Sequence, residues 1–376
     1  MFYKDFKGLK ISALGMGAMR LPVIDGDDSR PDTEKVFEMV DFAMKSGVNY
    51  YDTAWGYHSG NSERVMGKAL SRYPRESFFL ASKFPGYDLS NMDKVEEIFN
   101  KQLEKCGVDY FDFYLFHNVC ELNIDCYLDE RYGIYDHLMK QKENGRIRHL
   151  GFSAHGSRDV IKRFLERYGR SMEFCQLQLN YIDMTFQKDE EKIELIREYG
   201  LPIWVMEPLR GGMLASLSDE NASKLRRLCP NDGIPVWAFR YLESIPDVTV
   251  ILSGMSDLTQ LKDNINTFSV ERPLDENEKA VLSEIAEEMI KSIVLPCTAC
   301  RYCTSHCPME LDIPMLLELY NEHKFTGGGF IAPMALGSIE KDKQPSACIG
   351  CRSCEQVCPQ QIKISEAMSD FSSMLG

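Results

Sequence analysis

Four side chains suited to proton transfer stand at the ends of three short apolar runs in the first third of the chain. They are Asp52, after residues 48–51, with Tyr57 in the loop beyond it; Lys83, after residues 78–82; and His117, after residues 110–116. Short apolar runs of this kind predict strands, and barrel folds place their chemistry at the carboxyl ends of strands. We therefore expect a carboxylate, a phenol, an amine and an imidazole to gather in one catalytic site.

Eight of the thirteen cysteines lie near the end of the chain and repeat one spacing. The first run is Cys297, Cys300, Cys303 and Cys307, followed by Pro308; the second is Cys348, Cys351, Cys354 and Cys358, followed by Pro359. Both read C-x-x-C-x-x-C-x-x-x-C-P, the pattern of bacterial ferredoxins that hold [4Fe–4S] clusters. Two such clusters are predicted as metal centres.

The fourth cysteine of each run ligates the other cluster in two-cluster ferredoxins. By that rule one cluster takes Cys297, Cys300, Cys303 and Cys358, and the other takes Cys348, Cys351, Cys354 and Cys307. Structural zinc sites also use two-residue gaps, but they need neither the third gap nor the trailing proline. Whether the clusters carry electrons or only stabilise the fold stays open.

Charge and composition narrow the partners and the location. The 376 residues carry a formal charge of −14, which argues against nucleic acid or an anionic membrane as a partner. No apolar run approaches the roughly 18 residues of a spanning helix. The first residues, Met1 to Lys7, lack the features of a secretory signal, so we expect a cytoplasmic protein.

From Lys10 to Met289 short apolar runs alternate with amphipathic helical stretches. The expected strands are residues 10–15, 48–51, 78–82, 111–116, 148–152, 174–179, 202–206 and 248–252. The expected helices begin near Thr33 and then cover residues 62–70, 92–106, 132–144, 158–168, 188–199, 221–242, 258–265 and 277–289. This rhythm predicts an α/β fold, a (β/α)8 TIM barrel over residues 1–289. An open doubly wound sheet is disfavoured because no strand leads into a Gly-rich dinucleotide turn.

Residues 290–376 lack this rhythm and form a second, small domain. It contains both cysteine runs, a helix expected at residues 313–325 and a glycine loop at 327–329. A domain of this size gains little from hydrophobic burial alone, and bound metal would supply the missing stability. We expect a ferredoxin-like iron–sulfur domain.

The barrel residues resemble the aldo/keto reductase family over residues 5–270. The resemblance is carried by Tyr51-Asp52-Thr53-Ala54 with Tyr57, Ser62-Glu63-Arg64, Gly67 to Leu70, Lys83, His117, Gly151-Phe152-Ser153, Pro208-Leu209 and Gly254 to Asn264. The whole chain is similar to the ferredoxin-fused branch of that family. The resemblance implies an oxidoreductase in which Tyr57 is the general acid. It also implies that Lys83 favours the phenolate, Asp52 holds Lys83, and His117 orients a substrate carbonyl.

The same resemblance implies a nicotinamide site. Its expected contacts are Ser153, Gln176, Met206, Pro208, Leu209, Arg210, Gly212, Ser253, Gly254, Ser256, Gln260 and Asn264. The match is incomplete: Ala154 replaces an Asn, and Met206 replaces the stacking aromatic. Lys262 is the only nearby cation and Asp257 stands close to it, so NADP, NAD and even a flavin stay open.

Three functions follow from these features. In the first, the barrel reduces a small carbonyl compound with a nicotinamide. In the second, ferredoxin-type electrons, through a flavin or a redox partner protein, drive the reduction. In the third, the barrel is a sensing or scaffold module and the clusters are structural. The four proton-transfer residues weigh against the third function. Nicotinamide moves two electrons as hydride whereas each cluster moves one, so a direct link between them needs a flavin or a radical-tolerant step.

Overall fold

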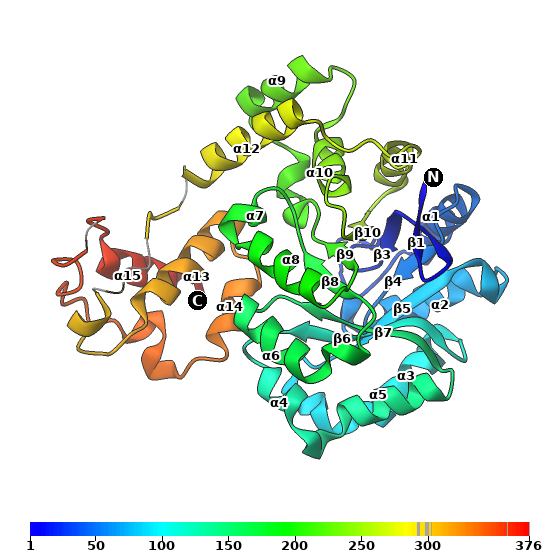
Figure 1. Ribbon diagram of the computed structural model, residues 1–376, viewed down its shortest axis with the longest axis horizontal. Coiled ribbons are helices and arrows are strands. Elements are labelled where there is room, and N and C mark those ends of the chain that lie inside the picture. The colour runs from blue at the N-terminus through cyan, green and yellow to red at the C-terminus, as the bar shows by residue number, and fades with distance from the viewer. Residues whose placement is uncertain (292–293, 298–300, 302, 359, 376) are drawn as a thin grey trace. The chain divides into compact units, whose positions relative to one another are not determined.

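The computed structural model describes residues 1–291, 294–297, 301, 303–358 and 360–375. Eight parallel strands pair in chain order, and the last pairs with the first to close a barrel (Figure 1). They are β3 (Leu14–Gly17), β4 (Tyr50–Asp52), β5 (Phe79–Phe84), β6 (Phe111–Val119), β7 (Ile147–Ala154), β8 (Cys175–Gln178), β9 (Ile203–Met206) and β10 (Val248–Gly254). The predicted (β/α)8 barrel is confirmed.

Helices follow the barrel strands. They are α1 (Thr33–Lys45), α2 (Ser62–Leu70), α3 (Val95–Cys106), α4 (Ile124–Leu128), α5 (Ile134–Glu143), α6 (Arg158–Tyr168), α7 (Asp183–Phe186), α8 (Asp189–Glu198), α9 (Asp219–Leu228), α10 (Ile234–Glu243), α11 (Leu258–Thr267) and α12 (Glu276–Lys291). Among them, α1, α2, α3 and α6 pack apolar residues on the core. The helical stretch expected over residues 221–242 is present, but as two helices. Pro230 and Gly233 separate α9 from α10, because neither residue favours a helix interior.

The strand expected at residues 10–15 is wrong, because it joins parts of two elements. β2 (Leu9–Ser12) pairs antiparallel with β1 (Tyr3–Phe6), whereas the barrel begins at Leu14. Lys7 and Gly8, both with positive φ (52° and 85°), make the hairpin turn. The ring of Phe6 meets that of Trp204 edge to face at 5.0 Å, within an apolar cluster at the strand starts. This hairpin packs against the amino end of the barrel and leaves the carboxyl end for chemistry.

Two catalytic candidates lie inside strands rather than beyond them. β5 continues through Lys83 to Phe84, and β6 continues through His117 to Val119. The pairing of β6 with β7 shifts register between Phe116 and Val119, at a positive φ of 59° for Asn118. Such a bulge re-aims side chains, and here it lies directly beside His117.

The chain divides into two compact units, Met1–Ser283 and Glu284–Gly376. The boundary expected at residues 289 and 290 stays a prediction, since α12 runs continuously past both positions. The second unit contains α13 (Ile313–Thr326), α14 (Ile331–Leu336) and α15 (Ile364–Leu375). The helix expected at residues 313–325 is confirmed, whereas α14 and α15 were not predicted. No strand occurs in the described residues of this unit.

The core of the second unit is small and includes residues of the cysteine runs. Leu316 and Leu317 of α13 pack in one apolar cluster with Met368 and Phe371 of α15, and Cys303 and Cys354 belong to the same cluster. Across the described parts of both units, no helix has the length and apolar character needed to cross a membrane.

Candidate active site and iron–sulfur site

Asp52 and Lys83 form a buried ion pair at the carboxyl end of the barrel. Lys83 Nζ donates to Asp52 Oδ1 at 2.5 Å and to the Thr53 carbonyl at 3.0 Å, and both charged side chains are almost fully buried. Gln176 Nε2 donates to Asp52 Oδ2 at 3.2 Å, so three strands meet at this carboxylate. A buried pair with this many hydrogen bonds is fixed in position before any ligand arrives.

The phenol of Tyr57 lies beside this pair. Lys83 Nζ lies 5.2 Å from the centroid of the Tyr57 ring, and the rings of Tyr57 and His117 meet edge to face at 6.1 Å. Burial, and then the charges of Asp52 and Glu207, raise the pKa of Tyr57 well above its usual value. That Lys83 favours the phenolate stays a prediction, and in the ligand-free chain its ammonium is paired with Asp52. Tyr57 stays protonated, as a proton donor must.

His117 is held as a neutral imidazole. Burial, the ammonium of Lys83 and then His155 lower its pKa well below the usual value. Its Nδ1 makes no hydrogen bond within the described part of the chain, and the ring of Tyr87 packs edge to face on it at 5.2 Å. A neutral imidazole beside a protonated phenol provides the groups needed to orient and protonate a carbonyl oxygen.

A cavity of about 850 Å³ opens next to these residues. Asp52 and Tyr57 line one part of it. Ten of the predicted cofactor contacts line it too: Gln176, Met206, Pro208, Leu209, Gly212, Ser253, Gly254, Ser256, Gln260 and Asn264. The cavity therefore joins the proton-transfer residues to the loop after β10, a length suited to an extended ligand.

Two predicted contacts do not line this cavity in the described structure. Ser153 is fully buried, and its Oγ accepts from the backbone N–H of Asn118 at 2.8 Å. Arg210 is buried too, and its Nε donates to Asp183 at 3.0 Å. The ion pair directs Arg210 to the protein interior, so its role is to anchor the turn at residues 209–212 rather than to face a phosphate.

Among the charged residues of the cavity lining that were not predicted as contacts, Arg20 and Glu207 lie just beyond strands. Arg20 follows β3, and its side-chain carbons run alongside Gly254, where a Cβ would come within 3.2 Å of them. Its guanidinium makes no hydrogen bond or ion pair to any residue that the structure describes. Glu207 directly follows β9. A charged residue just beyond a strand end was the signal that could have found both.

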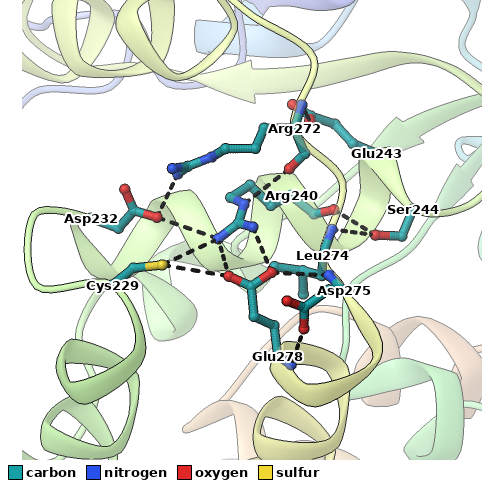
Figure 2. Close-up of polar contacts among 9 residues, drawn as sticks. All are labelled: Cys229, Asp232, Arg240, Glu243, Ser244, Arg272, Leu274, Asp275 and Glu278. Atoms are coloured by element: carbon teal, nitrogen blue, oxygen red, sulfur yellow. Dashed lines mark hydrogen bonds and ion pairs between the residues drawn. The ribbon is translucent and has the colours of Figure 1, made fainter.

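Buried Arg240 is the centre of a polar network that includes two residues of the cavity lining, Asp232 and Arg272 (Figure 2). This guanidinium donates to both oxygens of Glu278, at 2.8 and 2.6 Å, and to the Arg272 carbonyl at 2.9 Å. Arg272 lines the cavity, but Asp232 pairs with it at 2.5 Å and offsets its charge. Lys262, the cation expected near a 2′-phosphate, lies instead over the ring of Phe42.

A second cavity, of about 410 Å³, lies on the other side of the Tyr57 loop. Trp55 and Tyr87 line it together with Arg64 and Lys105. The Tyr87 hydroxyl packs so closely on Gly56 that a Cβ there would come within 2.2 Å of it. Both aromatics thus border the loop that carries Tyr57.

Four cysteines of the C-terminal unit line one small cavity, together with Met309, Leu311 and Ile313. They are Cys307, Cys348, Cys351 and Cys354, the four assigned to one cluster from the ferredoxin spacing. In the part of the chain that the structure describes, these thiols do not form a closed metal-binding group, so their ligation stays a prediction. Thiol groups are nonetheless the ligands that a [4Fe–4S] cluster takes.

The other predicted ligand set is only partly described. Cys297, Cys303 and Cys358 belong to or pack against the apolar cluster of the C-terminal unit. Cys300 lies outside the described residues, so its place in this set stays a prediction.

Comparison with known proteins decides the family. Residues 13–287 match the aldo/keto reductase family. The chain belongs to this family. Residues 296–362 match a 4Fe-4S dicluster domain, so this aldo/keto reductase carries a C-terminal ferredoxin-type domain.

Curated relatives match the barrel at low identity. The chain is 24% identical to the NADH-specific methylglyoxal reductase of Escherichia coli over 75% of its own length and 96% of the relative. It is 25% identical to L-galactose dehydrogenase of Arabidopsis thaliana, over 77% and 94% of the two chains. The family match and its oxidoreductase relatives together show that this chain is an oxidoreductase.

Solved structures match the same region. The holo form of an aldo-keto reductase from Bacillus halodurans superposes with a TM-score of 0.62 at 25% identity, covering 76% of this chain and 96% of that one. An aldo-keto reductase from Klebsiella pneumoniae, in complex with NADPH, has a TM-score of 0.59 at 17% identity over the same shares. The second likeness shows the fold alone.

Proposed function

We propose that the barrel reduces a carbonyl group of a small molecule with a nicotinamide cofactor, and that the reaction is coupled to one-electron transfer through two [4Fe–4S] clusters. The observation that carries this proposal is the cavity that joins Tyr57 and Asp52 to the loop after β10. A carbonyl beside Tyr57 and a cofactor along the rest of the cavity would use all of its length.

The proton side of the reaction falls to four residues. Tyr57 holds a proton at neutral pH, because its pKa is raised, and donates it to the carbonyl oxygen. His117, neutral because its pKa is lowered, orients that oxygen through an N–H. Lys83 and Asp52 hold each other 2.5 Å apart beside the phenol, which keeps the donor in place as charge develops.

The cofactor side rests on the cavity lining. Bound nicotinamide supplies the hydride. Gln176 and Met206 line the cavity together with Tyr57 and would flank the ring, while Ser253, Ser256 and Asn264 would contact the adenosine half. Arg20, whose guanidinium has no protein partner among the described residues, would bind the phosphates between them.

The charges near the adenosine half favour NADH over NADPH. Gln260 and Asp263 line the cavity there, and Asp257 caps α11 through the Gln260 N–H at 2.9 Å. Arg272 is paired with Asp232. A 2′-phosphate would meet neutral or acidic groups in this region, which is unfavourable for a dianion.

The clusters would add one-electron steps, and each cluster moves a single electron. Two clusters together can take the two electrons of one hydride. A direct link between nicotinamide and clusters needs a flavin, or another step that passes these electrons on one at a time. A partner protein would exchange electrons with the C-terminal unit. Met206 in place of a stacking aromatic is the observation that favours the second candidate, a flavin- or ferredoxin-linked reduction without direct use of nicotinamide.

Turnover on a panel of small aldehydes and ketones tests the proposal. The cluster-replete wild type and Tyr57→Phe are compared with NADH and with NADPH, and the purified protein is analysed for flavin. Oxidation of NADH that needs both a carbonyl compound and Tyr57 is the expected result. Absence of nicotinamide oxidation together with tightly bound flavin would favour the second candidate instead.

A further inference from the structure

Glu207 has a position in the cavity that no catalytic step above uses. It follows β9 directly, and its backbone has a positive φ of 55°, uncommon for a residue with a side chain. Its Oε2 accepts a hydrogen bond from the backbone N–H of Gly211 at 2.6 Å. The carboxylate thus bonds the turn at residues 209–212 that encloses this part of the cavity.

The turn at residues 209–212 presents the backbone N–H of Gly211 to the Glu207 carboxylate. Arg210, Gly211 and Gly212 have positive φ in succession, at 46°, 66° and 101°. The N–H of Arg210 donates to the Glu207 carbonyl and that of Gly212 to the Leu209 carbonyl, both at 2.9 Å. The N–H of Gly211 is therefore the donor that the carboxylate takes.

The carboxylate also lies within electrostatic reach of the catalytic phenol. Its charge is one cause of the raised pKa of Tyr57. At the turn, Glu207 Oε2 and Arg20 Nη2 lie 3.9 and 3.6 Å from the position that a Cβ on Gly211 would take. A carboxylate and a guanidinium thus face the same point of the cavity wall.

We propose that Glu207 is a specificity-determining residue for the ligand of this cavity: in the ligand-free chain it holds the anion position of the turn, and phosphates bind there only by displacing it. The inference rests on the proposed function in that a dinucleotide enters this cavity. It follows that Glu207 weakens every ligand that places a phosphate at Gly211, whereas a ligand without phosphate is unaffected.

Ligand affinities of single variants test this assignment. Glu207→Gln keeps an acceptor for the Gly211 N–H and removes the charge. Glu190→Gln, at an exposed position of α8, makes the same change in net charge elsewhere. Dissociation constants are measured by calorimetry for NADH, for ADP-ribose and for adenosine. We expect Glu207→Gln to bind NADH and ADP-ribose about tenfold more tightly than wild type and Glu190→Gln, about 1.4 kcal/mol, with adenosine unchanged.

A second variant separates the charge from the geometry of the turn. Glu207→Ala removes both charge and acceptor and leaves the Gly211 N–H open to phosphate, so ADP-ribose should again bind more tightly. Unchanged or weaker ADP-ribose binding in both variants would overturn the assignment. The two measurements separate failure of this assignment from failure of the proposed function. Tighter ADP-ribose binding without NADH turnover supports the role of Glu207 and sinks the reductase, whereas Tyr57-dependent turnover with unchanged affinities does the reverse.

Discussion

The two units of this aldo/keto reductase hold their chemistry in opposite ways. In the barrel, the ion pair of Asp52 and Lys83 and the rings of Tyr57 and His117 are fixed by strands and hydrogen bonds without a ligand. In the C-terminal unit, cysteines are part of the small apolar core itself. We therefore expect the barrel to fold without metal and the C-terminal fold to depend on the metal that its cysteines bind.

This difference has a physical basis in size. A large domain buries enough apolar surface to offset the cost of desolvating an ion pair at its centre. A small unit has no such reserve, and metal ligation then contributes directly to folding. The two units should therefore respond oppositely to loss of metal and to loss of a buried charge.

Removal of iron should have the largest effect. Anaerobic chelation should raise hydrogen exchange in α13 and α15 by roughly a hundredfold or more, while amides of the barrel strands exchange as before. Hydrogen-exchange mass spectrometry measures both units at once. Cys354→Ser should act in the same direction, and Cys126→Ser, in α4 of the barrel unit, should not. If the amides of α13 and α15 stay protected from exchange after iron is removed, the two units do not differ in their dependence on metal.

Loss of the Tyr57 hydroxyl should be the largest effect on chemistry. Tyr57→Phe should lower kcat for carbonyl reduction by about 10²–10⁴-fold, the range typical of a lost general acid, with little change in the affinity for NADH. The comparison needs steady-state rates and a dissociation constant from the same preparation. A rate within twofold of wild type would remove Tyr57 from its proposed role.

Loss of one partner of the buried ion pair should destabilise the barrel alone. Lys83→Met leaves Asp52 buried without a cation, which costs about 3–5 kcal/mol. All three tryptophans lie in the barrel, so urea unfolding followed by tryptophan fluorescence reports this unit. The double variant Asp52→Asn with Lys83→Met should recover most of the loss. Equal losses in the single and double variants would show that packing, not charge, is responsible.

Acid should weaken the barrel through His155. Burial, followed by the charge of Lys192, lowers its pKa to about 4. The unfolded chain therefore binds this proton first, and the free energy of unfolding falls as the pH drops from about 6.5 toward 4, by up to about 3 kcal/mol. His155→Gln should flatten the fluorescence-detected pH profile of stability. The less buried His137, as His137→Gln, should change it less.

Sequence patterns predicted the elements that depend on residues close together in the chain. Strand–helix alternation was enough for the barrel, and helices 62–70 and 158–168 have the bounds that their apolar spacing predicts. The hairpin before β3 was missed because β2 ends at Ser12 and β3 begins at Leu14, so the two strands form one apolar run in the sequence. The break between α9 and α10 was present as Pro230 and Gly233, and it was given too little weight.

The site was harder to predict because its contacts join distant segments. The place of Asp52 and Tyr57 beside one cavity followed from the rule on strand ends. Nothing local indicated that Arg210 would pair with Asp183, or that burial and the charge of Asp52 would raise the pKa of Tyr57. Those outcomes depend on burial and on partners that only the folded chain defines.

One measurement tests most directly the claim that the two units form one oxidoreductase. NADH is added anaerobically to protein with both clusters reconstituted, and visible absorbance and electron paramagnetic resonance are followed. We expect bleaching of the clusters and a reduced-cluster signal, both weakened by Arg20→Ala. Clusters that stay oxidised with NADH and with NADPH, yet are reduced by dithionite, would contradict this claim.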